Sequence, residues 1–335
     1  MALWSRDLVE TADWRGRDSR LPFRFVGRPL DIQIPQCHYG SRMSQQHLDR
    51  LRDWFLSAKR CLIAYSGGVD SVLLAVVGHQ VLQGASIAVI ADSPSLARQE
   101  LRDAQDIAER YGFPLRIVRT REFENPSYLA NPSNRCYFCK SELFSELSPL
   151  ARDLGMTTIV YGENASDQWD DRPGAKAASE FAVRAPLKEL GLTKPDIRSI
   201  SALLGLPTAE KPQMACLSSR IPQGEAVTEP KLRMVEAAEA VLRSLGFYDV
   251  RVRHHETPKA ALARIELGPS EIVRVFDPAM RQAIIESLLA AGYQFVTLDL
   301  AGYRRRGPIS LPGTDGAAAD ARDPDPENNG QLPSI

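Results

Sequence analysis

Short apolar runs alternate with longer amphipathic stretches from residue 46 to residue 161. Runs such as SIAVIA and TTIVY are typical of buried strands, and the stretches between them have the length of helices. This alternation predicts βαβ units, and hence a parallel sheet with right-handed crossovers. We expect strands at 61–65, 86–91, 115–119 and 157–161, and helices at 44–59, 71–83, 95–111 and 139–154.

The pattern changes beyond residue 228, where two strand-like runs follow each other directly. Neighbouring strands without a helix between them indicate an antiparallel pair, so we expect a smaller α+β domain here. The fold class predicted is therefore α/β, a parallel sheet flanked by helices, with a C-terminal α+β domain. The expected elements are helix 228–245, strands 247–253 and 261–267, a short helix from 269, helix 278–290 and strand 293–298.

Composition divides the chain further. The stretch 185–212 is rich in proline, apart from one helix at about 195–205, and this is typical of a linker. The last residues are rich in Pro, Gly and Asp and poor in apolar side chains, which favours disorder. We expect an N-terminal extension at 1–45, an α/β domain at 46–206, a linker with a cysteine motif at 207–227, the α+β domain at 228–307 and a disordered tail at 308–335.

Charge and cysteine content narrow the class of protein. The chain has 335 residues, with 41 basic and 42 acidic side chains, so no global charge attracts nucleic acid and we expect no nucleic-acid partner. Five cysteines in a chain this long fit a reducing compartment better than a disulfide scaffold. The N-terminus lacks an apolar signal region and no apolar run is long enough to span a membrane. We therefore expect a cytoplasmic protein without a membrane partner.

The string SGGVDS, residues 66–71, connects the first strand to an apolar helix. Gly67 and Gly68 let the backbone approach a ligand, and the unpaired N–H groups of the helix start attract an anion. Ser66 and Ser71 add hydroxyl donors, while Asp70 is suited to cap the helix or to bind Mg²⁺ beside phosphates. The string lacks the lysine of the nucleoside-triphosphatase loop and the spacing of the dinucleotide motif. It predicts a phosphate site of another type.

SGGVDS resembles the PP-loop of the ATP pyrophosphatases. That family cleaves ATP between the α- and β-phosphates and adenylates a carbonyl or carboxyl oxygen. The resemblance implies that residues 66–71, including Val69, bind the pyrophosphate of ATP with Mg²⁺, and that Asp92 borders the adenine. YGENASD resembles the segment that follows the fourth strand in these enzymes, which makes Glu163 and Asp167 candidates for Mg²⁺ or substrate contact. For Asp167 a helix cap is an equal alternative.

Three cysteines stand in two further strings, NRCYFCK and MACLSSRIPQG. Cys136 and Cys139 form a C-x-x-C pair, and Cys216 follows much later. The residues leave four readings open: a structural zinc, which lacks a fourth ligand, a redox disulfide, inert thiols, or a [4Fe–4S] cluster on three thiolates. We expect Cys61, in its strand, to be a buried and unreactive thiol. The same reading is possible for Cys37, whose sequence setting is uninformative.

The strings MACLSSRIPQGEAVT, FYDVRVRHHE and LDLAGYRRRG resemble the LarE sulfur transferases over about residues 46–307. That family adenylates the carboxylates of pyridinium-3,5-biscarboxylic acid mononucleotide and replaces an oxygen of each with sulfur, in the synthesis of the nickel-pincer nucleotide. In one branch the cysteine of the ACLSSR string gives up its sulfur and ends as dehydroalanine. The C-x-x-C pair resembles the other branch, in which Cys136, Cys139 and Cys216 bind a [4Fe–4S] cluster whose open iron carries the transferred sulfide.

Several charged residues fit an anionic substrate. Arg251 and Arg253 share one face of a strand and are candidates to bind one oxyanion with His254 and His255; solvated strand charges are the alternative. Lys140 and Arg220 are candidates to neutralise charge at phosphate or cluster, so Cys216, Lys140 and Glu163 are the catalytic candidates. For Glu236 and Glu239 a solvent-facing role is as well supported as a ligand role, and Arg304–Arg306 are candidates to cover the site.

Three rival functions share part of these features. A tRNA-thiolating PP-loop enzyme should show a basic surface or an RNA-binding module, which the balanced charge disfavours. Synthetases that amidate nucleotides share the loop without needing three cysteines, and a non-catalytic ATP or iron–sulfur sensor would not release pyrophosphate. We expect a homo-oligomer acting on a small pyridinium mononucleotide; the sequence does not identify the sulfide donor.

Overall fold

The computed structural model describes residues 38–169, 173–212, 215–258 and 260–303. The predicted extension 1–45 lies mostly outside the described residues, as do Cys37, Arg304–Arg306 and the predicted tail 308–335. The chain divides into two units, residues 1–38 and 39–335. Apart from His38, where the first helix begins, every described residue belongs to the second unit. No helix among the described residues is both long and apolar enough to cross a bilayer.

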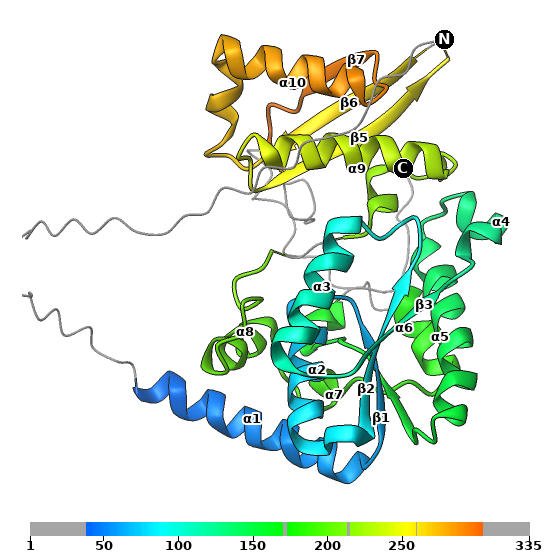
Figure 1. Cartoon of the computed structure of the whole chain (residues 1–335), viewed down its shortest axis with the longest axis vertical. Coiled ribbons are helices and arrows are strands. Elements are labelled where there is room, and N and C mark those ends of the chain that lie inside the picture. Colours follow the sequence, from blue (N-terminus) through cyan, green and yellow to red (C-terminus); the bar gives the residue numbers. More distant parts are fainter. Residues whose placement is uncertain (1–37, 170–172, 213–214, 259, 304–335) are drawn as a thin grey trace, which may run out of the picture. The chain divides into compact units, whose positions relative to one another are not determined.

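A four-stranded parallel sheet forms the first layer of the fold, in the order β3-β2-β1-β4 (Figure 1). Ile63 in the middle of the sheet pairs with Ala88 on one side and with Val160 on the other. The strands are β1 (Cys61–Tyr65), β2 (Ser86–Asp92), β3 (Leu115–Arg119) and β4 (Thr158–Val160). The predicted α/β class with a parallel sheet is confirmed.

Helices cover both faces of this sheet because its strands are apolar on both sides (Figure 1). Ile63 and Tyr65 of β1 face one helical layer, while Leu62 and Ala64, which alternate with them, face the other. The helical layer on the Ile63 side comprises α1 (His38–Ala58), α2 (Val69–Leu82), α3 (Arg98–Tyr111), α7 (Pro186–Glu189) and α8 (Lys194–Leu203). The other helical layer comprises α5 (Arg135–Asp153) and α6 (Pro173–Glu180).

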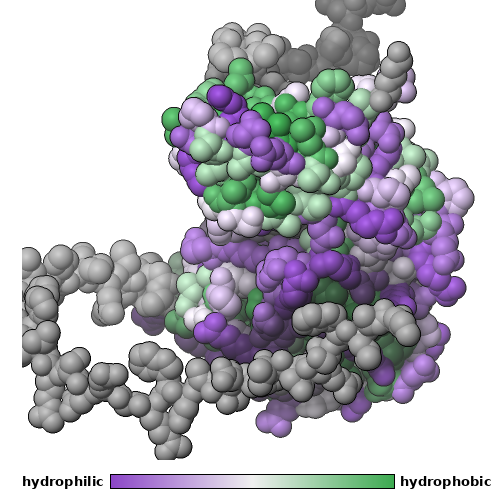
Figure 2. Space-filling view, turned by 45° about the horizontal axis from the view of Figure 1, so that its top comes forward, coloured by the Kyte–Doolittle hydropathy of each residue, from purple (hydrophilic) through white to green (hydrophobic). Residues whose placement is uncertain are grey.

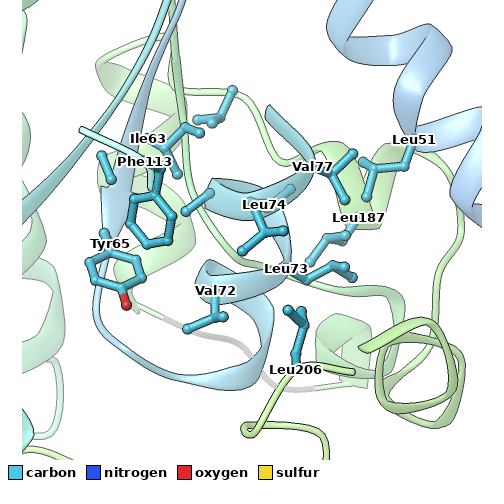
Figure 3. Close-up of a cluster of buried hydrophobic side chains, with 14 of the residues drawn as sticks. Leu51, Ile63, Tyr65, Val72, Leu73, Leu74, Val77, Phe113, Leu187 and Leu206 are labelled. Carbon is cyan, nitrogen blue, oxygen red and sulfur yellow. The ribbon is translucent and has the colours of Figure 1, made fainter. Parts of the chain in front are cut away.

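The proline-rich stretch 185–212 is largely part of this core rather than a linker. Leu187 and Leu206 pack with Leu73 and Val77 of α2, as Figure 3 shows, and Leu192 is also fully buried. Two of the prolines stand in the first turn of α7 and α8. Proline is favoured there because its fixed φ suits a helix and the N–H it lacks has no partner within the helix. The linker prediction for 185–206 was wrong for this reason.

The C-terminal part forms a second, three-stranded sheet in the order β5-β6-β7. β5 and β6 are antiparallel, as predicted, and β7 runs parallel to β6. One core joins this sheet to two helices through residues such as Leu242, Val252, Ile265 and Leu288. Its elements are α9 (Glu229–Ser244), β5 (Val250–Thr257), β6 (Ala260–Leu267), η5 (Ile272–Phe276), α10 (Pro278–Ala290) and β7 (Phe295–Leu298).

The sequence pattern missed the short elements that surround the cysteines. α5 begins at Arg135 rather than 139, so that Cys136 and Cys139 lie inside its first two turns. The missed short elements are η1 (Gln83–Ala85), η2 (Glu122–Glu124), α4 (Pro126–Leu129), η3 (Ala165–Trp169), α6, α7 and η4 (Leu217–Arg220). Helices this short depend on tertiary contacts, so their sequences carry little period.

Large apolar side chains on the surface are concentrated in the C-terminal part. Figure 2 shows apolar areas there interleaved with hydrophilic ones. The exposed side chains beyond residue 247 are Tyr248, Val273, Phe276, Leu289, Phe295 and Leu300. The predicted homo-oligomer stays a prediction.

Candidate active site

The loop 66–71 is a compact turn between β1 and α2. Gly67 has φ +70°, a left-handed conformation in which glycine avoids the strain of a side chain. The Ser66 N–H donates to Ser71 Oγ over 3.1 Å, and Ser71 Oγ donates to the Gly68 carbonyl over 3.1 Å. Gly68 precedes α2 and no side chain caps its first N–H groups. These N–H groups and the helix dipole favour an anion, so we call residues 66–71 the anion loop; the binding of phosphate stays a prediction.

Two lysines distant in sequence reach this loop. Lys194 Nζ lies 2.5 Å from Asp70 Oδ2. Lys211 Nζ donates to the Gly67 carbonyl over 3.3 Å and lies 2.7 Å from Glu100 Oε2. Both ammonium groups are mostly buried, with 25% and 18% of the side chains exposed. They bring positive charge to the place where the loop would hold a pyrophosphate.

A cavity of about 210 Å³ adjoins the loop and is lined by Ser66, Asp70 and Ser71 together with Lys140 and Glu163. Glu163 is buried and accepts hydrogen bonds from the Tyr161 hydroxyl and from Lys188 Nζ, the latter over 2.9 Å. Burial alone would raise the pKa of Glu163, but the hydrogen bonds from Tyr161 and Lys188 outweigh it and hold the pKa below its usual range. Glu163 is thus an ionised carboxylate.

Two other cavity residues have definite positions. Lys140 Nζ lies 4.6 Å from the centre of the Tyr161 ring. Asp167 Oδ2 accepts from the Asn164 N–H over 3.2 Å, which is the capping geometry that the sequence left open. Lys140 therefore joins Glu163 beside the loop, as expected for two catalytic candidates.

Asp92, at the end of β2, is held by an arginine. Arg98 Nη1 lies 2.5 Å from Asp92 Oδ1, and its Nη2 donates to the carbonyls of Ser93 and Leu96 over 2.8 Å each. The Asp92 side chain therefore shapes the loop 93–96 through Arg98. Because Arg98 engages the Asp92 carboxylate, backbone groups of this segment, rather than that carboxylate, are suited to border the adenine.

The three cysteines of the two motifs come together. Cys139 stands in α5, Cys136 one turn before it, and Cys216 directly before η4. Burial raises the pKa of the Cys139 thiol, and the neighbouring Cys216, Glu122 and Cys136 raise it further. An effect of Cys216 and Cys136 on the same thiol requires both to be close to it. Cys139 also packs against the cluster that contains Leu217, the neighbour of Cys216, so the two motifs lie near each other; their use as one site stays a prediction.

This site does not have the geometry of a single-ion centre. Over the described ranges, no three His, Cys, Asp or Glu side chains are grouped so that they could hold one metal ion. The structural-zinc reading therefore finds no support. A cluster differs because each thiolate binds a different iron, so three thiols around a common space suit it without converging on one point. The donor set, three free thiols of which Cys136 and Cys216 are exposed, fits such a group.

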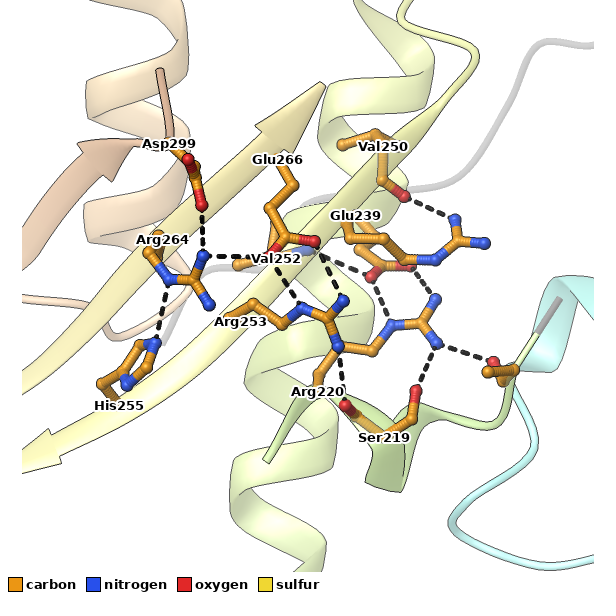
Figure 4. A network of polar contacts seen from close by, with 12 residues as sticks. Ser219, Arg220, Glu239, Val250, Val252, Arg253, His255, Arg264, Glu266 and Asp299 are labelled. Carbon is orange, nitrogen blue, oxygen red and sulfur yellow. Dashed lines mark hydrogen bonds and ion pairs between the residues drawn. The ribbon is translucent and has the colours of Figure 1, made fainter. Parts of the chain in front are cut away.

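A network of arginines and carboxylates holds the Cys216 segment against the C-terminal sheet (Figure 4). Arg220 is 1% exposed and forms a two-pronged pair with Glu239, with distances of 2.8 and 3.0 Å. The Nη1 of Arg220 donates to the carbonyls of Ala215 and Cys216 over 2.6 and 3.1 Å. Arg220 is thus a positioning residue for Cys216.

Arg253 is paired in the same way. It forms two hydrogen bonds with Glu266, of 3.0 and 2.9 Å, and its Nη1 donates to the Ser219 carbonyl over 2.8 Å (Figure 4). Arg251 is 3% exposed, and its guanidinium lies 4.8 Å from the centre of the Tyr303 ring. A substrate anion bound by Arg253 would compete with Glu266. The role of both arginines as anion ligands stays a prediction.

Other charged residues of this region are differently placed from what the sequence suggested. Glu239 is 1% exposed, so the solvent-facing alternative is wrong for it. Glu236 Oε1 accepts from the Arg98 backbone N–H. His254 is buried, with Nδ1 3.4 Å from the Tyr293 hydroxyl, and His255 Nε2 accepts from Arg264 Nε over 3.2 Å. His254 thus faces Tyr293, whereas His255 belongs to the network in which Arg264 and Arg253 share Glu266.

Sequence reasoning missed Lys188, Lys194 and Lys211. One signal was available for Lys194, which is the first residue of α8 and lies within the capping box of Thr193 and Asp196. A cation is disfavoured at this end of a helix by the helix dipole, so a lysine here calls for an external anion. Lys188 and Lys211 carry no comparable local signal.

The segment from Lys211 to Leu217 connects the two halves of the site. Lys211 contacts the Gly67 carbonyl at one end, and at the other the Leu217 N–H donates to the Ser95 carbonyl over 2.9 Å. Gly67 and Ser95 follow adjacent strands, β1 and β2. The thiol of Cys216 and the anion loop thus belong to the same edge of the sheet, which is where ligands bind in open parallel sheets.

Comparison with known proteins agrees with this arrangement. No protein-family model matches the chain. An uncharacterized protein of Synechocystis is 47% identical over 262 residues, 78% of this chain and 96% of that protein. A pyridinium-3,5-bisthiocarboxylic acid mononucleotide synthase of Lactiplantibacillus plantarum is 34% identical over 249 residues, 73% of this chain and 87% of the synthase. A tRNA-specific 2-thiouridylase of Geobacter metallireducens is 27% identical, over 70% of this chain and 77% of that enzyme.

The match to the synthase at 34% identity spans most of both proteins. The more distant thiouridylase shares the use of a PP-loop. The chain is therefore a member of the LarE family, the family of the pyridinium-3,5-bisthiocarboxylic acid mononucleotide synthases.

Proposed function

We propose that this chain is an ATP-dependent sulfurtransferase that converts the carboxylates of pyridinium-3,5-biscarboxylic acid mononucleotide into thiocarboxylates, in the synthesis of the nickel-pincer nucleotide. The observation that carries the proposal is the segment 211–217, which contacts the anion loop through Lys211 and the β2 loop through Leu217, with Cys216 between them. A sulfur source and an adenylating site at one edge of one sheet are what such a reaction requires.

The first half-reaction activates a carboxylate, which is a poor electrophile. A carboxylate oxygen attacks the α-phosphorus of ATP, and pyrophosphate leaves into the loop 66–71. The N–H groups at the start of α2, with Lys194 and Lys211, stabilise the negative charge that develops on the leaving group. Asp70 is suited to bind the Mg²⁺ that accompanies the phosphates.

The second half-reaction transfers sulfur. A carbon–sulfur bond forms at the acyl carbon, the carbon–oxygen bond to AMP breaks, and AMP leaves with that oxygen. Lys140, beside Glu163 in the cavity, would attract the carboxylate or phosphate of the substrate. Arg220 orients the Cys216 segment through the carbonyls of Ala215 and Cys216.

We also propose that Cys136, Cys139 and Cys216 bind a [4Fe–4S] cluster. Such a cluster held by three thiolates would supply an open iron able to carry a sulfide for transfer. The packing of Cys139 against the cluster of Leu217, the residue next to Cys216, supports this assignment. The alternative is that Cys216 gives up its own sulfur, in which case Cys136 and Cys139 would be bystanders.

The decisive experiment is anaerobic reconstitution of the full chain with iron and sulfide, followed by assay of pyrophosphate release and thiocarboxylate formation with the biscarboxylate mononucleotide. We expect iron, labile sulfide and visible absorption in the wild type, their loss in Cys136→Ala and Cys216→Ala, and their retention in Cys61→Ala. Repeated turnover without loss of sulfur from the chain is expected. A chain mass lowered by one H₂S after a single turnover, without bound iron, would contradict the cluster and indicate sacrificial chemistry.

Unmodified tRNA offered as acceptor separates the rival thiolating function. We expect no thiolated uridine and no pyrophosphate release with tRNA. A non-catalytic sensor would release no pyrophosphate with either acceptor.

A further inference from the structure

Asn131 has an unusual backbone conformation next to the cysteines. It is fully buried, has φ +53° and directly precedes Pro132. Asparagine visits the left-handed region more readily than most residues, but a residue before proline is pushed toward the extended region. Such a conformation persists where surrounding contacts hold it, and it is found disproportionately at functional sites.

Three of those contacts lead to the chain that follows Cys216. The Nδ2 of Asn131 donates to the carbonyls of Pro222 and Ile221 over 2.6 and 3.3 Å. Its own carbonyl accepts from the Gly224 N–H over 3.0 Å. Asn131 therefore binds three backbone positions of one loop, 221, 222 and 224, by side chain and main chain together.

Arg135 extends this connection toward the C-x-x-C pair. It is the first residue of α5 and immediately precedes Cys136. Its Nη1 donates to the Asn131 side-chain oxygen and, over 2.9 Å, to the carbonyl of Ser218. Ser218 is two residues after Cys216. One guanidinium thus links the turn of helix that carries Cys136 to the segment that carries Cys216.

The other contacts of the cysteine segment lead elsewhere. The Leu217 N–H bonds to the loop after β2, the Ser218 hydroxyl lies 2.7 Å from the hydroxyl of Tyr128 in α4, and Arg220 binds Glu239 of α9. None of these hydrogen bonds reaches α5, which meets the segment otherwise through apolar packing of Phe138 and Cys139 in the cluster of Leu217 and Ile221. Apolar packing holds surfaces together without fixing their register, so the directional contacts that align Cys216 with the helix of the other two thiols are those of Asn131 and Arg135.

We propose that Asn131 and Arg135 are positioning residues that set the separation between the Cys216 thiol and the two thiols of α5. This inference rests on the proposed use of the three cysteines as one site. It assigns the pair no contact with substrate. Loss of either residue should leave the thiols intact and change only how often they meet.

Cross-linking measures that separation without any metal. Dibromobimane alkylates two neighbouring thiols and joins them. Trypsin cuts after Arg135 and Lys140, so one peptide holds both α5 cysteines, whereas Cys216 lies on another peptide that ends at Arg220. Mass spectrometry then separates links between peptides from the Cys136–Cys139 link within one peptide. The second link is an internal control for reagent and exposure.

The test uses the full-length, metal-free chain and its variants. Asn131→Gly keeps the left-handed backbone free of strain and removes the side-chain hydrogen bonds. Arg135→Lys keeps the charge and the trypsin site but loses the planar guanidinium that bonds to both Asn131 and Ser218. We expect the ratio of inter-peptide to intra-peptide links to fall roughly fivefold in each, from the loss of one or two buried hydrogen bonds. Asn125→Gly, which only removes the cap of α4 (2.9 Å to the Ser127 N–H), should leave the ratio unchanged.

An unchanged ratio in Arg135→Lys, or an equal fall in Asn125→Gly, would overturn the proposal. Should Asn131→Gly fail to fold by circular dichroism, Arg135→Lys alone decides it. Iron content after anaerobic reconstitution gives a separate readout, expected to fall in both positioning variants. If the wild type binds no iron while the cross-link ratio still falls fivefold in the two variants, the cluster is refuted and the positioning pair is supported. The failure of the proposed function and the failure of this inference are therefore distinguishable.

Discussion

The ammonium of Lys194 lies 2.5 Å from the carboxylate of Asp70, although the two residues are 124 positions apart. Asp70 stands in the first turn of α2 and Lys194 is the first residue of α8, so this ion pair joins the starts of two helices beside the anion loop. In the proposed reaction, Mg²⁺ would be a better partner for Asp70, and the polyphosphate a better partner for Lys194.

Lys194→Met should therefore lower the rate of pyrophosphate release by roughly 10²-fold, the usual effect of removing one donor from developing negative charge. The measurement is kcat for pyrophosphate release at saturating ATP. Lys176→Met serves as the matched control because its ammonium lies over the Tyr137 ring, away from the loop. A decrease of the same size in both variants would show that the charge of Lys194 has no special role.

The two glycines of the loop should differ sharply in their tolerance of alanine. A Cβ on Gly67 would lie 3.1 Å from the Ala104 Cβ at φ +70°, whereas one on Gly68 would lie 3.5 Å from Ser66 Oγ, an ordinary contact. We expect Gly67→Ala to lower the free energy of unfolding by about 1–2 kcal/mol, and Gly68→Ala by less than about 0.5 kcal/mol. Urea denaturation without nucleotide measures both, and equal losses would contradict the assignment.

The buried pair of Arg220 and Glu239 should be costly to break. Arg220→Met leaves the Glu239 carboxylate at 1% exposure without its main partner, so we expect a loss of about 3–5 kcal/mol in the free energy of unfolding. The double variant Arg220→Met/Glu239→Leu removes both charges and should recover much of this loss. Chemical denaturation of the wild type, Arg220→Met, Glu239→Leu and the double variant gives the coupling energy; additive losses would show that the pair is not coupled.

The same pair makes stability depend on pH. Burial alone would raise the pKa of Glu239, but Arg220 and Arg243 outweigh it and lower the pKa. A carboxylate whose folded pKa is below its unfolded value of about 4.3 stabilises the fold above that value, and this stabilisation is lost as pH falls through the folded pKa. Urea midpoints should therefore fall more steeply below about pH 4.3 in the wild type than in Glu239→Gln. Parallel curves would refute this.

The thiols should differ in reactivity. Burial in β1 raises the pKa of Cys61 to about 12, although Arg184 lowers it slightly. At pH 8 only about one Cys61 thiol in 10⁴ is then ionised, and the thiolate is the reactive form. Iodoacetamide should therefore label the exposed Cys136 and Cys216 in the metal-free native chain and spare Cys61 until the chain unfolds. Peptide mass mapping tests this, and native labelling of Cys61 at a similar rate would contradict it.

Elements with a strong local signal were predictable. The strands Cys61–Tyr65 and Leu115–Arg119 and the helix Pro278–Ala290 have the predicted bounds, because apolar runs, turn residues and an Asp-Pro helix start mark their ends. The start of α5 was placed four residues late, and α7 was read as linker. In both places the helix is stabilised by packing, on Leu217 and Ile221 or in the main core, that no neighbouring residue reveals.

The anion loop could be read from six consecutive residues because its function resides in their own backbone and in the helix start that follows. The three cysteines could likewise be recognised from their spacing and from the resemblance of the surrounding strings. The lysines at the loop, the carboxylate partners of Arg220 and Arg253, and the bonds of Asn131 all join residues far apart in sequence. Folding alone brings such side chains together, since charge pairing and burial act over ångströms of space and leave no period or spacing along the chain.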